Sequence, residues 1–121
     1  MDALFFGAHP DDVELTSAGL AARLAELGHE VAIVDLTRGE AASRGSVADR
    51  MVEAEAAARE LGVAARENLE LPDLGIARTD RGQLSAVVRC LRRHRPVLVV
   101  APHADDAHPD HCEAAPLIAN A

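Results

Sequence analysis

Two short clusters of histidine and aspartate contain the residue types most able to do chemistry in this chain. They read His9-Pro10-Asp11-Asp12 near the start and His108-Pro109-Asp110-His111 near the end, and each follows a short apolar run. Imidazole nitrogens and carboxylate oxygens are the ligands that a borderline metal such as zinc prefers. In each cluster two candidate ligands lie three residues apart, so they can face the same way in a turn or a first helical turn. The two clusters therefore predict one composite metal site.

The first cluster provides His9 and Asp12 as candidate metal ligands, and His111 from the second cluster completes a set of three. Three protein ligands and an open position are the arrangement of a catalytic zinc site. Taken alone, either cluster has a simpler interpretation as a turn that caps a helix, because aspartate commonly plays that part. It is the combination of the two clusters that favours a metal.

The remaining residues of the two clusters suggest hydrolysis of an amide. Asp11 lies beside the candidate ligands and could take a proton from a water that attacks a carbonyl group. His108, held by Asp110, could stabilise the oxyanion and protonate a leaving amine. By contrast, we expect His94 to be a surface residue, and Asp106 to lie in a solvated loop.

The elements that must position these clusters alternate between strand and helix. Continuous apolar strands in such an alternation indicate a parallel sheet covered on both faces. In a doubly wound sheet of order 3-2-1-4, the first and fourth strands are neighbours, and ligands bind beyond their carboxyl ends. We therefore expect an α/β fold, a Rossmann-like parallel sheet of this order, that brings the two clusters together. Strands are expected at residues 2–7, 31–36, 68–71 and 96–101, and helices at residues 16–27, 51–61, 84–91 and 113–121.

Composition limits the possible functions. The net charge of −8 without a basic stripe argues against nucleic acid as a partner. The chain has no lysine, which excludes Schiff-base chemistry and the lysine of a Walker phosphate loop in this segment. No apolar run reaches membrane-spanning length, and the two cysteines, Cys90 and Cys112, form no CxxC pair. We expect reduced thiols and a cytoplasmic location, with Cys90 in the core.

Taken in order, three motifs resemble the LmbE/PIG-L family of zinc-dependent de-N-acetylases. The motifs are His9-Pro10-Asp11-Asp12 with Glu14, then Thr37-Arg38-Gly39-Glu40, then His108-Pro109-Asp110-His111. The resemblance runs through the whole chain. It implies a Rossmann-like fold and the hydrolysis of N-acetyl groups from glucosamine-containing small molecules.

The resemblance also implies roles for individual residues. His9, Asp12 and His111 would bind Zn²⁺, although another divalent metal such as Fe²⁺ stays open. Asp11 would be the general base, and His108 with Asp110 would stabilise the oxyanion. The sugar would be held by Arg50 and Asp73, with Arg38 as a further substrate-binding candidate. Residues 36–45 are most similar to the branch that acts in bacillithiol biosynthesis, whose substrate is N-acetylglucosaminyl malate.

Chains of this family are usually nearly twice as long. We therefore expect residues 1–121 to form a single LmbE-like de-N-acetylase domain that lacks the family's C-terminal part. The predicted order also leaves the apolar strand around Val97–Val100 at an edge of the sheet, which predicts association or aggregation of this chain alone. Members of the family are expected to form homo-oligomers.

Three other functions stay open at this point. A nucleotide-binding Rossmann-like module is one, although carboxylates follow the first strand where a glycine-rich phosphate loop would be expected. A non-catalytic metal-binding or sensing domain is another. A non-haem iron oxygenase shares the set of two histidines and one carboxylate. A nucleotide titration without metal would test the nucleotide-binding module, and release of acetate would separate the deacetylase from a metal-binding or sensing domain.

Overall fold

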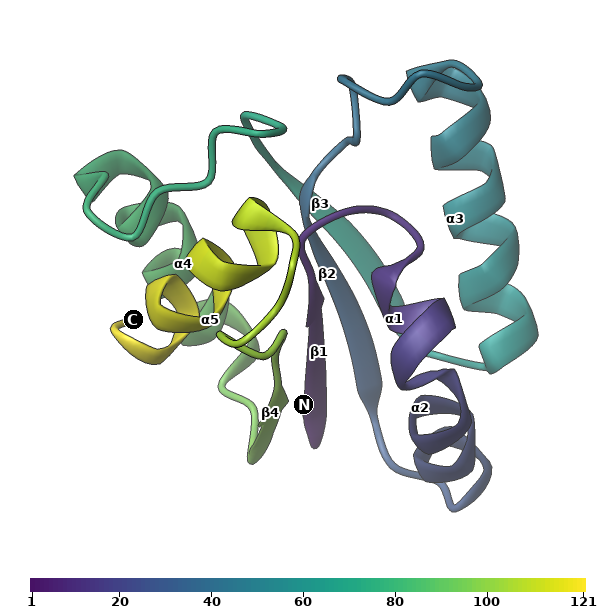
Figure 1. Cartoon of the computed structure of the whole chain (residues 1–121). Helices are drawn as coiled ribbons and strands as arrows, with labels where there is room; N and C mark the ends of the chain where they lie inside the picture. The colour runs from purple at the N-terminus through teal and green to yellow at the C-terminus, as the bar shows by residue number, and fades with distance from the viewer.

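Four parallel strands form the centre of the structure, and helices cover both of their faces (Figure 1). The computed structural model describes all 121 residues. The strand order is β3-β2-β1-β4, and every neighbouring pair is parallel, which confirms the expected α/β fold. The strands are β1 (Ala3–Gly7), β2 (Val31–Thr37), β3 (Ala65–Leu71) and β4 (Leu98–Val100). The helices are α1 (Asp12–Thr16), α2 (Ala18–Glu26), α3 (Val47–Leu61), α4 (Arg81–His94) and α5 (Pro109–Ala119).

The central strand β1 contributes alternate side chains to two separate cores. Leu4 and Phe6 point toward α4 and α5, whereas Ala3 and Phe5 point toward α1 and α2. This follows from the two-residue period of a strand, which sends successive side chains to opposite faces. β1 and β2 are buried along their whole length, which explains why both read as continuous apolar runs. Their burial gives the loops at their carboxyl ends a rigid base.

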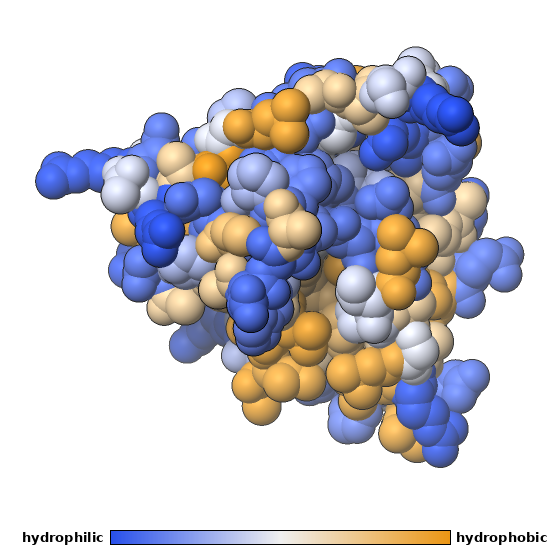
Figure 2. All heavy atoms as spheres, in the orientation of Figure 1, coloured by the Kyte–Doolittle hydropathy of each residue, from blue (hydrophilic) through white to orange (hydrophobic).

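The edge strand β4 is short and partly open to solvent. Leu98 and Val99 are 43% and 40% exposed, and the neighbouring Val97 is 89% exposed. Apolar atoms gather over this part of the molecule in Figure 2. The apolar edge predicted from the sequence is therefore present, although the strand covers residues 98–100 in place of 96–101. None of the helices has the length and apolar character needed to cross a membrane.

The first helical segment differs from the prediction. It begins at Asp12, directly after the first cluster, and breaks at Ser17 before α2 continues. Ser17 is the N-cap residue of α2, but its side chain makes no capping hydrogen bond. Leu20 and Leu27 are 47% and 57% exposed, whereas Ala21 is buried. The break at Ser17 separates α1 from α2, so a single helical period does not describe both segments.

The last helix, α5, begins four residues earlier than predicted. His108 is its N-cap, with Nδ1 accepting a hydrogen bond from the Asp110 backbone N–H at 3.1 Å. Pro109 occupies the first turn, where its missing N–H costs nothing. The second cluster therefore forms the N-terminus of a helix.

The strand β3 also begins earlier than predicted, at Ala65 in place of residue 68.

Candidate metal centre and active site

The fold brings His9, Asp12 and His111 together at the carboxyl ends of β1 and β4. One possible ligand atom from each lies within 4.8 Å of the others. His111 Nε2 is 3.0 Å from Asp12 Oδ2, and His9 Nδ1 is 3.6 Å from the same oxygen. The two histidines come from opposite ends of the chain, and the shared carboxylate lies between them.

His111 Nε2 shows that this group fits a metal ion. The atom is buried and has no hydrogen-bond partner, because its short contact with Asp12 does not have hydrogen-bond geometry. A buried polar atom without a partner is costly and calls for an explanation. A divalent cation coordinated by the three side chains would provide one, and the set of two imidazoles and one carboxylate suits zinc or iron.

The other ring nitrogen of each histidine contacts a carboxylate. His9 Nε2 lies 2.8 Å from Asp110 Oδ2 and 3.1 Å from Asp73 Oδ1, and His111 Nδ1 lies 3.2 Å from Asp106 Oδ2. Carboxylates in this position fix the ring orientation and raise the basicity of metal-binding histidines. Asp106 was predicted to lie in a solvated loop. Its carboxylate is partly exposed, but it contacts the candidate ligand His111. Nothing in the sequence indicated this contact.

Asp110 holds a different histidine from the one predicted. Its carboxylate contacts His9 and accepts hydrogen bonds from the backbone N–H groups of Leu74 and Ile76, at 2.9 Å and 3.4 Å. Only its backbone N–H reaches His108. The reason is that Asp110 lies in the first turn of α5 with its side chain directed into the loop after β3. Burial raises the pKa of Asp110, but the bonds from His9 and the two N–H groups outweigh it and lower the pKa below the usual value.

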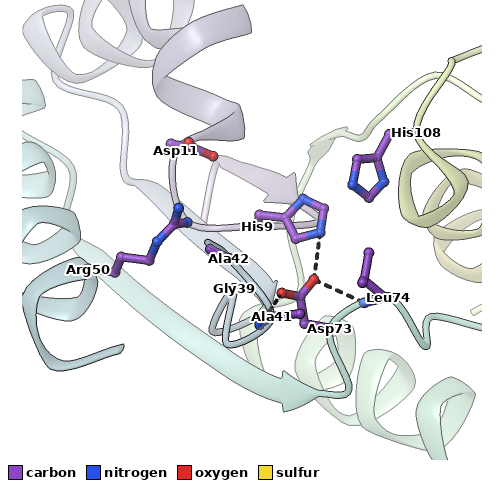
Figure 3. A pocket seen from close by; sticks show the side chains of 9 residues that line it. All are labelled: His9, Asp11, Gly39, Ala41, Ala42, Arg50, Asp73, Leu74 and His108. Atoms are coloured by element: carbon purple, nitrogen blue, oxygen red, sulfur yellow. Dashed lines mark hydrogen bonds and ion pairs between the residues drawn. The ribbon is translucent and has the colours of Figure 1, made fainter. Parts of the chain in front are cut away.

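A pocket of about 270 Å³ opens beside the three candidate ligands (Figure 3). Asp11 and Arg50 lie on one side of His9, and His108 lies on the other. The His108 ring is 4.7 Å from that of His9, centroid to centroid. The pocket therefore unites most of the predicted site residues outside the metal set. Its lining is His9, Asp11, Gly39, Ala41, Ala42, Arg50, Asp73, Leu74 and His108.

The predicted base, Asp11, has an unusual backbone and an unusual acidity. Its φ of 147° lies in a region that favours glycine, and such strain is often found at functional sites. Burial and the neighbouring charge of Asp12 raise its pKa, against the lowering effect of Arg50. A carboxylate whose pKa is raised toward neutral pH is a better general base than an ordinary one.

His9 has the largest change of acidity among the candidate ligands. Burial lowers its pKa, but hydrogen bonds with Asp12 and Asp110, together with the charges of Asp12 and Asp73, raise the pKa to about 9. Since only neutral imidazole binds a metal, the proton and the metal compete for this side chain.

The loop after β2 borders the pocket, and Gly39 is the residue that allows it. Gly39 has a φ of 65°, and a Cβ added there would lie 2.9 Å from the Arg50 guanidinium. Asp73 joins this loop to the site, because its Oδ2 accepts a hydrogen bond from Ala41 N at 2.8 Å. Arg38 does not line the pocket, and its side chain is exposed, so the structure does not group this substrate-binding candidate with Arg50 and Asp73.

Two further groups of charged residues were not found from the sequence. Arg66 on β3 pairs with Asp35 and Glu14 below the site, and burial raises the pKa of Asp35 to about 6 despite the opposing effect of Arg66. On the other face of β3, Glu67 contacts Cys90 and His94 of α4. The prediction that His94 is a surface residue was wrong, since its side chain is 15% exposed. The only signal was the spacing of four between Cys90 and His94, which places them on one helix face.

Comparison with known proteins gives a consistent result. Residues 4–121 match the family model described as PIG-L, GlcNAc-PI de-N-acetylase. A deacetylase of Escherichia coli K12, YaiS, described as uncharacterised, is 34% identical over an alignment that covers 89% of this chain and 60% of that protein. The conserved protein TT1542 of Thermus thermophilus is 42% identical with a TM-score of 0.94, over 98% of this chain and 54% of that one.

Two other solved structures are similar at lower identity. The N,N'-diacetylchitobiose deacetylase of Pyrococcus horikoshii is 29% identical with a TM-score of 0.87, over 96% of this chain and 47% of that one. The 4-carboxy-2-hydroxymuconate hydratase GalB of Pseudomonas putida KT2440 is 27% identical with a TM-score of 0.82, over 99% of this chain and 55% of that one. The chain thus spans 47% to 60% of the length of the relatives that it matches.

Proposed function

This chain belongs to the PIG-L family, described as GlcNAc-PI de-N-acetylase, and from that premise we propose that it hydrolyses the N-acetyl group of a glucosamine-containing small molecule with a divalent metal. The observation that carries the proposal is the buried Nε2 of His111, which has no hydrogen-bond partner and lies 3.0 Å from the Asp12 carboxylate that His9 also contacts. Beside this group a pocket contains a carboxylate of raised pKa, Asp11. The names of the E. coli and P. horikoshii relatives point to the same reaction.

In the proposed mechanism, His9, Asp12 and His111 hold the metal, which we propose to be zinc. When bound, such an ion polarises the acetyl carbonyl and increases the acidity of water. The carboxylates of Asp110 and Asp106 keep the two imidazole rings in the orientation that presents a nitrogen to the ion.

Proton transfer and oxyanion stabilisation are assigned to two residues on opposite sides of His9. Asp11 takes the proton of the attacking water, which its raised pKa favours. Asp11 then passes this proton to the leaving amine of the sugar, while His108 stabilises the developing oxyanion by donating a hydrogen bond. Its Nδ1 accepts the hydrogen bond from Asp110 N, which leaves Nε2 as the ring nitrogen that faces substrate.

Arg50 and Asp73 are the candidates for binding the sugar hydroxyls, because both line the pocket next to Asp11 and His9. The likeness of residues 36–45 to the bacillithiol branch makes N-acetylglucosaminyl malate the first substrate to test. We further propose that the protein works in the cytoplasm as a homo-oligomer. Its substrate is a small molecule, and we propose neither nucleic acid nor a membrane as its partner.

A second candidate is hydration of a substrate without an acetyl group. It is favoured by the similarity to the P. putida hydratase, which shares this fold at 27% identity. The same metal ligands and the same base would serve either reaction, since both activate water. The two candidates differ in their product, because only deacetylation releases acetate.

The experiment is metal analysis of the purified chain together with an acetate-release assay. The substrates are N-acetylglucosamine, N,N'-diacetylchitobiose and N-acetylglucosaminyl malate. We expect one metal ion per chain and acetate from at least one sugar, and loss of acetate in Asp11→Asn. Metal without acetate would favour a metal-binding domain or a hydratase, and nucleotide binding by the metal-free chain would favour a nucleotide-binding module.

A further inference from the structure

Arg66 connects four elements directly below the candidate site. Its guanidinium binds Asp35 on β2 through Nε and one terminal nitrogen, at 2.8 Å and 3.1 Å. It binds both carboxylate oxygens of Glu14 on α1 and the backbone carbonyl of Ala54 on α3. Every one of its five N–H donors therefore has an acceptor, and its side chain is only 5% exposed. A buried arginine so completely bonded holds its partners in one fixed geometry.

The partner on α1, Glu14, is two residues from Asp12 and three from Asp11 of the first cluster. α1 has only five residues and no side-chain capping bond, so it has little stability of its own. It begins at Asp12, one residue after the strained Asp11. The Glu14 side chain bonds this short helix to Arg66 on the sheet.

The partner on β2 lies close behind the same helix start. Asp35 pairs in register with Gly7 at the end of β1. A Cβ added at Gly7 would lie 3.2 Å from the Asp12 Cβ and 3.5 Å from Asp35 Oδ1. Asp35 and Asp12 thus flank the same glycine, and Arg66 supplies the cation that offsets the negative charge gathered there. Removing one partner of a buried charge network leaves the others uncompensated.

We propose that Arg66 is a positioning residue for the reaction. By bonding Glu14 and Asp35 together, it sets the start of α1 and so the placement of the metal ligand Asp12 and the base Asp11. This inference rests on the proposed function, because it assigns Arg66 a part in placing the groups that bind metal and accept the proton. Arg66 itself touches neither the pocket nor the three candidate ligands.

Glu67, the next residue of β3, provides a matched control. Its side chain points to the other face of the sheet and is bonded to Cys90, Arg93 and His94 of α4. Glu67→Gln therefore weakens a comparable charged network on the same strand without touching α1. If Arg66 acts only through overall stability, the two networks will have the same effect on the site.

The experiment compares Arg66→Gln, Arg66→Lys, Glu14→Gln and Glu67→Gln by Co²⁺ titration, by the kcat and KM of acetate release, and by urea unfolding. We expect Arg66→Gln and Glu14→Gln to weaken Co²⁺ binding and lower kcat by about 10- to 100-fold, with KM little changed. Arg66→Lys keeps the charge but not the planar fork, so it should recover only part of the loss. Glu67→Gln should lose stability and keep both kcat and Co²⁺ affinity.

The outcomes separate this inference from the proposed function. If the wild-type chain binds Co²⁺ but releases no acetate, the proposed function fails, and Co²⁺ affinity still decides whether Arg66 positions Asp12. If Arg66→Gln and Glu14→Gln behave like Glu67→Gln, Arg66 is a structural residue only and the inference is overturned. If Arg66→Gln does not fold, Glu14→Gln decides, since Glu14 is partly exposed and that variant keeps the shape of the side chain.

Discussion

The cluster of His9, Asp12 and His111 and the cluster of Glu67, Cys90 and His94 each bring three possible metal ligands together. In each, three possible ligand atoms lie within 4.8 Å of one another. They differ in whether those atoms already have partners. Glu67 Oε1 accepts a hydrogen bond from the Cys90 thiol at 3.3 Å and lies 2.6 Å from His94 Nε2, so the carboxylate itself occupies the point where the other two converge.

The comparison teaches that ligand types within reach of one another do not make a metal site. The first cluster has a buried nitrogen without a partner and adjoins a pocket, whereas the second is satisfied and packs an edge strand against a helix. Burial and the charge of Glu67 also raise the pKa of Cys90 to about 12, so the thiol stays protonated and is a poor ligand. We therefore propose metal binding for the first cluster and a structural role for the second.

The largest expected effect is on metal retention. His111→Ala removes one of three ligands, and we expect the purified variant to lose its metal on dialysis and to have no measurable turnover. Cys90→Ser is the control from the other cluster and should keep one metal per chain. Metal analysis of both variants tests the comparison directly. If His111→Ala kept its metal and Cys90→Ser lost it, the Glu67 cluster would be the metal site and the His111 cluster would not.

Asp11→Asn separates chemistry from binding within the first cluster. The amide cannot accept the proton of the attacking water, so we expect turnover to fall by roughly 10²-fold or more. Metal content should be unchanged, since Asp11 is not among the three converging residues. Steady-state kinetics and metal analysis provide the measurement. A variant that has lost its metal would show that Asp11 is a ligand and that the roles of the two aspartates are reversed.

Asp106→Asn tests a smaller contribution to the same cluster. The carboxylate contacts His111 Nδ1, and its loss should lower the basicity of the ring and weaken metal binding by about 10-fold. We expect the low end of the usual range because the Asp106 side chain is 37% exposed. Competition with a chelator measures the affinity. An unchanged affinity would mean that the contact does not orient His111.

Glu67→Gln should have the smallest effect, and that effect should be on stability. Burial raises the pKa of Glu67, but its bonds with Arg93, His94 and Cys90 lower it more, so the folded-state pKa lies below the usual 4.5. A lowered pKa stabilises the fold above pH 4.5, and this stabilisation is lost as the pH falls through the folded-state pKa. We expect the variant to lose about 1 kcal/mol at pH 7 and much less in acid. Urea unfolding at both pH values would contradict this if the two losses were equal.

Much of the fold could be predicted because β1 and most of β2 are apolar and buried. Such strands must be covered on both faces, and helices between parallel strands provide that cover. The helix breaks were harder to predict, because α1 and α2 are divided at Ser17 by packing that the apolar period does not record. The start of β3 was missed because Arg66 and Glu67 read as polar, although each is bonded to a partner on its own face.

By itself the sequence determined which side chains could bind a metal and which strands would bring them together. Local residue types and the apolar pattern contain that information, since they depend on ligand chemistry and on the burial of whole strands. Only the tertiary structure decided that Asp110 holds His9, that Asp106 contacts His111, and that Arg66 anchors the helix that begins at Asp12. These contacts join residues from different elements, and their partners depend on side-chain directions that are set when the helices pack on the sheet. The same packing leaves His111 Nε2 without a hydrogen-bond partner, whereas Glu67 is hydrogen-bonded to both Cys90 and His94.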